Sequence, residues 1–232
     1  MCLPGLVYAQ AVMKHVECVM LAAGSSTRMH SWKMMLPWAG STIVEHSVRT
    51  ALQVCSRLIL VVGFRAEELI DIFDSWSNVE AVQNRDYQAG MFSSVQTGVQ
   101  VVAEGSFFLA LADMPGVTAA IYRNLLKWGE RLDRVAQGSP YAVIPQFKGK
   151  KGHPLLLSAE LRAGILRSES SKTLRDVLAG VPTLIVPVDE PGILQDIDTP
   201  ADYRSRSADV GDTGSEVALT EDESNGYPTE QS

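Results

Sequence analysis

The sequence contains no long hydrophobic run and few cysteines, and both absences narrow the class of protein. No apolar stretch among its 232 residues reaches the roughly 20 residues that a membrane-spanning helix needs. The N-terminus lacks the basic segment and the apolar segment of a signal peptide. Cys2, Cys18 and Cys55 are odd in number and show no Cys-x-x-Cys spacing, which argues against a disulfide framework and a zinc site. We therefore expect a cytoplasmic protein that spans no membrane.

Two common phosphate-binding loops are also missing. The P-loop pattern fails after Gly24, because Met29 stands where the second glycine of that pattern is required. The dinucleotide fingerprint needs three glycines within six positions, and this loop has one. A phosphate site in this loop would therefore use a different binding mode.

The chain as a whole has no excess of basic residues. There are 27 acidic and 20 basic residues, and residues 209–230 hold seven of the acidic ones and none of the basic ones. The rest of the chain therefore carries 20 of each, which gives no basic stripe for a nucleic-acid backbone, and we expect no nucleic-acid partner. The composition predicts a flexible leader over 1–15, one domain over 16–206, and an acidic, disordered tail over 207–232.

What the chain does contain is organised around one stretch near the N-terminus. Residues 16–23, apolar apart from Glu17, have the length and composition of a buried parallel strand. Residues 24–27 are small and favour a tight turn with exposed backbone N–H groups, and the cations Arg28 and Lys33 follow. Such a loop could hold an oligophosphate, or it could be an ordinary turn between a strand and a helix with two surface charges.

Alternating patterns after this stretch predict a parallel sheet. Helical periodicity over 41–55 and 66–76 alternates with apolar strands over 58–62 and 79–82, and Thr42 and Glu45 form a capping-box pattern. Short connections between such elements favour a doubly wound α/β fold. Further strands are expected over 107–112, 142–145, 155–157 and 183–188, with helices over 95–103 and 118–132.

Carboxylates follow two of the expected extended segments. Asp113 comes directly after the most apolar strand, at the end where open α/β sheets bind ligands. It could instead cap the next helix, although Thr118 can serve as that cap. Asp196 and Asp198 are two residues apart and so share one face of an extended segment. The alternative for Asp198 is that it belongs to the helix cap at Thr199.

Two further segments are candidates for ligand binding. Gly90 precedes Ser93 and Ser94, either of which could cap the following helix, whose free N–H groups would face an anion. That segment could equally be only a capped helix. Lys151 and His153 lie in a glycine-flanked basic turn, which could meet an anionic substrate or be a solvated hairpin.

Five segments together resemble the molybdopterin-cofactor nucleotidyltransferases, a family built on a glycosyltransferase-A-like domain. Within that family the resemblance is greatest to the cytidylyltransferase branch. It covers roughly residues 16–203, with the segments in the family's order and spacing. The segments are Leu-Ala-Ala-Gly-x-Ser-x-Arg-Met with a following lysine (21–33), Gly-Met-Phe-Ser-Ser (90–94), Leu-Ala-Asp-Met-Pro (111–115), Lys-Gly-His-Pro (151–154) and Asp-Ile-Asp-Thr-Pro (196–200).

The resemblance implies a fold and a reaction. The fold would be a three-layer α/β domain with a mostly parallel, Rossmann-like sheet of the nucleotide-diphospho-sugar transferase type. The reaction would be a Mg²⁺-dependent transfer of a nucleoside monophosphate to the phosphate of molybdopterin cofactor, with release of pyrophosphate. In the family, the sequence Ala-Ala-Gly, here residues 22–24, occurs in the members that use a cytidine nucleotide, so CTP is the expected donor. A molybdenum hydroxylase apoprotein is an expected partner.

The resemblance also assigns roles to individual residues. Catalytic roles fall to Arg28, Lys33 and Asp113, and metal ligation to Asp113, Asp198 and Asp196. Substrate binding falls to His153 and Lys151. The nucleotide site comprises Leu21, Ala22, Ala23, Gly24, Ser25, Ser26, Lys33, Gly90, Ser93 and Ser94.

The chain departs from the family pattern at two places. Residues 167–172 replace a Gly-Asp-x-Gly-type loop, and His30 stands where glycine commonly follows Arg-Met. The first departure leaves open a sugar phosphate or isoprenoid phosphate as acceptor. A non-catalytic accessory protein that hands the cofactor to a molybdenum hydroxylase is the third reading. The retained Lys33, Asp113 and Asp198 argue against it, since a carrier does not need metal ligands.

Overall fold

A mostly parallel sheet forms the centre of the protein, as the sequence predicts. The computed structural model describes residues 15–25, 29, 31–169 and 171–208. Within them an eight-stranded sheet has the order β10-β7-β9-β6-β1-β4-β5, with β8 paired to β7. The strands are β1 (Glu17–Ala22), β4 (Arg57–Val62), β5 (Val79–Gln83), β6 (Phe107–Leu111), β7 (Ala142–Phe147), β8 (Lys150–Lys151), β9 (Leu155–Leu157) and β10 (Thr183–Pro187).

Parallel pairing dominates the half of the sheet that carries the first strands. β1 lies between β4 and β6 and is parallel to both, and β4 is parallel to β5. Two strands of the sheet are exceptions, because β9 runs antiparallel to β6 and β7 and the short β8 runs antiparallel to β7. The carboxyl ends of β1, β4 and β6 therefore meet at one edge of the sheet. A separate short hairpin joins β2 (Pro37–Trp38) and β3 (Ser41–Thr42).

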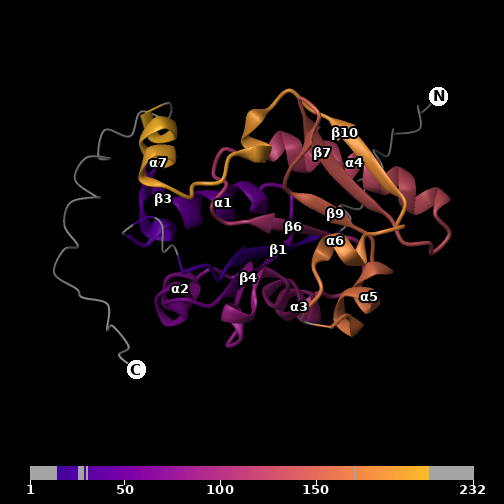
Figure 1. Ribbon diagram of the computed structural model, residues 1–232, viewed down its shortest axis with the longest axis horizontal. Coiled ribbons are helices and arrows are strands. Elements are labelled where there is room, and N and C mark those ends of the chain that lie inside the picture. Colours follow the sequence, from indigo (N-terminus) through magenta and orange to yellow (C-terminus); the bar gives the residue numbers. More distant parts are fainter. Residues whose placement is uncertain (1–14, 26–28, 30, 170, 209–232) are drawn as a thin grey trace, which may run out of the picture.

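Helices cover both faces of the sheet, which gives the three layers (Figure 1). Cys18 and Met20 point to one face of β1, and Val19 and Leu21 to the other, so the strand contributes to two separate cores. The first core contains side chains of α1 (Ile43–Leu52), α2 (Ala66–Phe73) and α4 (Ala119–Val135). The second contains side chains of α3 (Met91–Val101) and α5 (Leu161–Arg167).

Local sequence signals explain two features of this packing. The predicted capping box is present at the start of α1. The Thr42 side chain accepts a hydrogen bond from the Glu45 amide, and the Glu45 side chain accepts one from the Thr42 amide. Gly98 lets α3 approach the sheet, because a Cβ there would lie 2.4 Å from Val19 and 2.7 Å from Val61.

The segment after β10 crosses the carboxyl edge of the sheet. Its elements are η3 (Pro191–Leu194) and α7 (Pro200–Ser207), and the backbone between them is tied to β6 by the bond from Ile197 N to Asp113 O (2.9 Å). His153 N, in the turn before β9, donates to Ile193 O (3.0 Å) and also holds the segment. Ile197 and Tyr203 are fully buried in a small third core near β2. This docking places residues 196–198 beside the end of β6.

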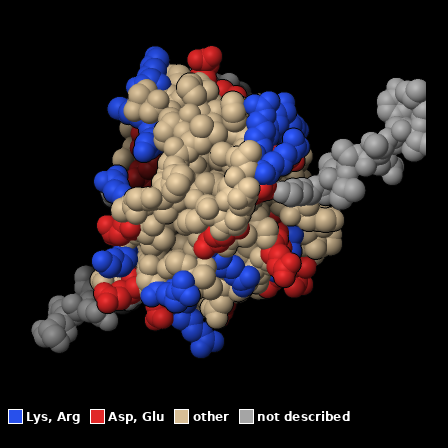
Figure 2. Space-filling view, turned by 90° about the vertical axis from the view of Figure 1, so that its right-hand side faces the viewer, with Lys and Arg blue, Asp and Glu red and all other residues tan. Residues whose placement is uncertain are grey.

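The remaining described helices are short. They are η1 (Lys33–Met35), η2 (Tyr87–Ala89) and α6 (Leu174–Val177). None of the helices in the described ranges is long and apolar enough to cross a membrane. Figure 2 shows one face of the molecule, on which basic and acidic side chains alternate around a broad uncharged centre.

Candidate active site

A cavity of about 580 Å³ opens at the carboxyl ends of β1 and β6. It lies where open parallel sheets bind ligands. Its lining combines the end of β1, the start of η1, the region around η2 and the three predicted carboxylates. The lining residues are Leu21, Ala23, Gly24, Ser25, Lys33, Met34, Tyr87, Gln88, Met91, Ser94, Leu111, Asp113, Asp196 and Asp198.

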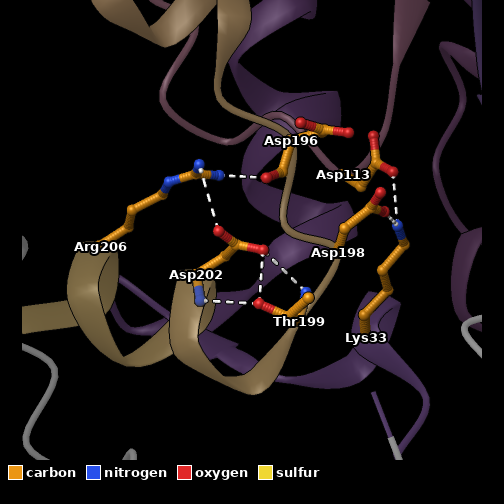
Figure 3. A network of polar contacts seen from close by, with 7 residues as sticks. All are labelled: Lys33, Asp113, Asp196, Asp198, Thr199, Asp202 and Arg206. Carbon is orange, nitrogen blue, oxygen red and sulfur yellow. Dashed lines mark hydrogen bonds and ion pairs between the residues drawn. The ribbon is translucent and has the colours of Figure 1, made fainter. Parts of the chain in front are cut away.

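Lys33 joins two of the carboxylates inside this cavity (Figure 3). Its Nζ lies 2.6 Å from Asp113 Oδ2 and 2.8 Å from Asp198 Oδ1, although the three residues are far apart in the sequence. Lys33 is only 6% exposed. Burial lowers the pKa of Lys33, but the charges and hydrogen bonds of Asp113 and Asp198 outweigh it, and the net pKa lies above its ordinary value. The lysine is therefore a buried cation held between two anions.

The helix caps beside these carboxylates are made by other residues. Thr199 Oγ1 accepts from the Asp202 amide (3.2 Å) and Asp202 Oδ2 accepts from Thr199 N (2.9 Å), so this pair caps α7. Arg206 donates to the carbonyl of Asp196 and lies 3.7 Å from Asp202. Thr118 takes the N-cap position of α4. The side chains of Asp113 and Asp198 instead contact Lys33.

Two residues of the carboxylate cluster, Asp113 and Asp198, offer oxygen atoms of the type that a hard divalent cation prefers. Asp113 Oδ1 is buried and has no hydrogen-bond partner among the described residues, so one oxygen of this ligand is uncommitted. Burial first, and then the charges of Asp198 and Asp113, raise the pKa of Asp196. Across the described ranges, however, no three His, Cys, Asp or Glu side chains are close enough together to hold a metal ion. Asp113 and Asp198 nevertheless offer carboxylate oxygens, the ligand type that Mg²⁺ prefers, and the metal role of Asp113, Asp198 and Asp196 stays a prediction.

Several predicted nucleotide-site residues line this cavity and others do not. Ala22 lies in the first core, on the face of β1 that points away from Leu21. Gly90 lines a second cavity, and Ser93 lines a surface hollow next to α3. Ser26 and Arg28 lie outside the described residues.

The start of α3 differs from the prediction. Gly90, and not Ser93 or Ser94, is the N-cap residue, because its φ of 111° makes the turn into a helix that already begins at Met91. The hydroxyls of Ser93 and Ser94 instead contact Asn84. Ser94 is 4% exposed, and each hydroxyl accepts a hydrogen bond from Asn84 Nδ2 (2.9 Å). Asn84 thus fixes the first turn of α3 against the end of β5.

The two residues predicted to bind the acceptor differ in burial and in whether they line a cavity. His153 lines the second cavity, and its Nδ1 is buried without a partner in the part of the chain that the structure describes. Burial lowers the pKa of His153 below its ordinary value, against a smaller opposing effect of a backbone hydrogen bond to Leu109 and of the Asp113 charge. Lys151 lies exposed on β8 and lines neither cavity, so its role at the acceptor stays a prediction.

Sequence reasoning missed Met34 and Gln88 as lining residues, and it included Met91 only as part of the Gly-Met-Phe-Ser-Ser segment. They are placed by η1, η2 and the first turn of α3, and only the tertiary packing of those turns brings them to the cavity. Tyr87 could have been found, because the Asn84-x-x-Tyr87-x-x-Gly90 spacing was visible. Its ring lies against Gly63, where a Cβ would come within 2.7 Å of Tyr87 Cβ.

Comparison with known proteins agrees with this geometry. Residues 18–193 match the family described as "MobA-like NTP transferase domain". The chain belongs to this family. It is 37% identical over 191 residues to the molybdenum cofactor cytidylyltransferase of Escherichia coli K12, covering 82% of this chain and 95% of the relative. The sequence-based prediction of a nucleotidyltransferase is therefore confirmed.

Two further relatives of this MobA-like chain show how widely its fold is used. Nicotine blue oxidoreductase from Paenarthrobacter nicotinovorans is 29% identical over 161 residues, covering 67% of this chain and 76% of that protein. The structure of a nucleotidyl transferase from Methanothermobacter superposes with a TM-score of 0.69 at 22% identity, covering 85% of this chain and 98% of the other. The second match confirms the predicted fold class.

Proposed function

We propose that the protein transfers CMP from CTP to the phosphate of molybdopterin cofactor and releases pyrophosphate, with Mg²⁺ as cofactor. The observation that carries the proposal is the Lys33–Asp113–Asp198 cluster in a cavity at the carboxyl edge of the sheet. The 37% identity to the Escherichia coli cytidylyltransferase, over nearly all of that enzyme, supports this donor and acceptor. A molybdenum hydroxylase apoprotein would receive the product.

The proposed mechanism relies on position and charge. The acceptor phosphate is already an anion, so its attack on the α-phosphorus of the nucleotide needs no general base. Asp113 and Asp198 would hold Mg²⁺, which neutralises charge on the phosphoryl oxygens when bound. Lys33 lines the same cavity and would place its ammonium against the triphosphate. Arg28 would contribute a second cation.

The end of β1 would hold the nucleotide. Leu21, Ala23 and Gly24 line the cavity with small or apolar groups, and Ser25 adds a hydroxyl. Among the residues that the structure describes, none lies within 4 Å of the Cβ position of Gly24, and on that side the backbone would be open to a ligand. Asp196 would act as an outer partner of the metal. Cytosine as the base rests on the Ala-Ala-Gly sequence.

The experiment that tests the proposal is pyrophosphate release from CTP, GTP, UTP and ATP with Mg²⁺, with and without molybdopterin cofactor. We expect release from CTP only when the cofactor is present. Release that depends on a sugar phosphate or isoprenoid phosphate would replace the acceptor while keeping the chemistry. The absence of release from all four nucleotides with every acceptor would overturn the proposed reaction.

A further inference from the structure

The turn between β4 and α2 stands beside the candidate active site. Phe64 N donates to Ala23 O (3.2 Å), and Ala23 lines the active-site cavity. We infer that Arg65 in this turn is a positioning residue for nucleotidyl transfer, which holds the ring of Trp32 and, through it, the adjacent Lys33. The inference rests on the proposed function, because only in that reaction does Lys33 act on the triphosphate.

The guanidinium of Arg65 lies over the ring of Trp32. Its Cζ is 4.6 Å from the ring centre, which is within the range of a cation–π contact. Trp32 is 8% exposed and packs in the first core, so the guanidinium covers an aromatic ring at the boundary of that core. Trp32 Nε1 is buried and has no hydrogen-bond partner among the described residues. The ring is therefore held by packing contacts, and Arg65 supplies one of them.

Glu68 fixes the plane of this guanidinium. Arg65 Nε donates to Glu68 Oε1, and Arg65 Nη2 donates to Glu68 Oε2 (2.8 Å). A guanidinium can donate two parallel hydrogen bonds from its edge while its face lies on an aromatic ring, which a lysine cannot do. The two side chains are 43% and 49% exposed, so the ion pair contributes little to stability. What the pair supplies is a fixed orientation of the guanidinium.

The backbone of Arg65 is in the left-handed conformation. Its φ of 51° and ψ of 42° are unfavourable for a residue with a Cβ, and such strain persists where other contacts of the residue offset it. Three other non-glycine residues in the described ranges have a positive φ: Ala39 and Lys148 lie in hairpin turns, and Gln137 follows α4. Of these four, Arg65 alone follows a strand that is adjacent to β1. The strained residue is therefore the one that contacts the segment after β1.

The position of the Trp32 ring reaches Lys33 through the backbone. Trp32 is the N-cap residue of η1, its carbonyl accepts from Met35 N (3.1 Å), and Lys33 is the first residue of η1. Neither Arg65 nor Trp32 is among the described residues that line the active-site cavity. A shift of the ring would therefore act on the reaction by displacing the lysine, and a displacement of about 1 Å can slow an enzyme roughly a hundredfold.

The test compares the kinetics of Arg65→Ala with those of wild type. We expect kcat to fall roughly tenfold or more while the KM for CTP changes less than about threefold, because the variant misplaces Lys33 without removing a nucleotide contact. Arg49→Ala is the matched control, since Arg49 also stacks on a tryptophan, Trp76 (4.4 Å), pairs with Glu45 (3.8 Å) and does not line the cavity. Its kcat and KM should stay within about twofold of wild type. An unchanged kcat in Arg65→Ala, or a KM effect that exceeds the kcat effect, would overturn the inference.

A double-mutant cycle shows whether Arg65 acts through Trp32. In a Trp32→Leu background, Arg65→Ala should change kcat less than about twofold, because the ring that it holds is gone. Glu68→Ala gives a second cycle at an exposed position, which decides if Trp32→Leu fails to fold, and its effect on kcat should likewise not multiply with that of Arg65→Ala. Effects that multiply in either cycle would overturn the inference.

Arg65→Gly separates the side chain from the backbone. Glycine adopts the left-handed conformation without strain, so this variant should have a Tm at or above that of Arg65→Ala and the same low kcat. A kcat that glycine restores to the wild-type value would contradict the inference, since the conformation of the turn alone would then be what matters.

A stability cycle separates this inference from the proposed function. Lys33→Met should lower the Tm of Arg65→Ala by less than about half as much as it lowers the Tm of wild type, because the lysine is then no longer held between its carboxylates. This measurement needs no turnover, so a reduced shift supports the positioning role even if wild type transfers no nucleotide. Equal shifts in the two backgrounds would overturn the inference and leave the proposed function standing.

Discussion

Replacing Lys33 with methionine tests the cluster at the centre of the site. The change removes the ammonium that lies 2.6 Å from Asp113 and 2.8 Å from Asp198, and it keeps a side chain of similar length. Removing one member of a fully buried ion pair costs about 3–5 kcal/mol. Here the two carboxylates keep 18% and 26% of their side-chain exposure, so water screens part of their repulsion. We expect a loss of roughly 2 kcal/mol on that scale.

Calorimetry measures this loss directly. For a domain of about 200 residues, 1 kcal/mol shifts Tm by about 2–4 °C, so Lys33→Met should melt roughly 4–8 °C below wild type without divalent cations. Mg²⁺ or Mn²⁺ should restore more stability to the variant than to wild type, because the carboxylates no longer have a competing cation. Saturation at about 100 times Kd corresponds to about 2.7 kcal/mol.

Lys127→Met is the control, since Lys127 is exposed on α4 and the change is chemically the same. Its Tm should match wild type with and without the cation. The reasoning is refuted if Lys33→Met has the same Tm as wild type in the absence of divalent cations. It is also refuted if the cation shifts the Tm of both chains equally, because the lysine and the metal would then not share a site.

Three other predictions concern catalysis, pH and the C-terminal residues. Asp113→Ala should reduce kcat by roughly a hundredfold or more with an unchanged circular dichroism spectrum, and near-normal turnover would remove Asp113 from the mechanism. Burial lowers the pKa of His46 and His153 below 6.5, so between pH 6.5 and those lowered values the unfolded chain binds protons that the folded chain does not. The free energy of unfolding should therefore fall as the pH falls through that window, by at most about 1.4 kcal/mol per pH unit for each histidine. Urea titrations at several pH values measure this free energy, and in His46→Gln it should depend less steeply on pH than in wild type. Deleting everything after Ser207 should leave turnover unchanged, and a large loss in the same assay would show that this segment contributes to activity.

The sheet was predictable because its strands carry strong local signals. Apart from Glu17 and Arg57 at their first positions, β1, β4 and β6 are continuous apolar runs, and burial on both faces requires that composition. The capping box at Thr42 and Glu45 is equally local, since it needs only residues three apart. These elements fix which strand ends lie at the carboxyl edge, and hence where Asp113 stands.

The contacts within the site were less predictable. The sequence placed Lys33, Asp113 and Asp198 in one site, but not the lysine between the two carboxylates, because that geometry depends on how the segment after β10 docks through Ile197. Ala22 shows the same limit. Its place in the run Ala-Ala-Gly suggested a nucleotide contact, whereas strand alternation directs its side chain into the core.

The segment 171–175, which lines the second cavity, had almost no signal in the sequence. Residues 167–172 stood out as a departure from a family pattern, and nothing in the order of residues 171–175 indicated that they would line a cavity together with Leu109 and His153. That proximity arises because Gln96 ties α5 to α3, a contact between residues about 70 positions apart. The start of α3 was misplaced for a related reason, since the serines that resemble caps are held by Asn84 instead.

The central claim is that the Lys33–Asp113–Asp198 cluster carries out nucleotidyl transfer. The most direct measurement follows the α-phosphate: wild type and Asp113→Asn are each mixed with CTP labelled at the α-phosphorus, Mg²⁺ and molybdopterin cofactor, and the label is followed in a single turnover. We predict that wild type moves the label from CTP onto the cofactor with one pyrophosphate released per transfer, and that Asp113→Asn binds CTP but transfers at least a hundredfold more slowly. Equal transfer rates in the two proteins would contradict the account.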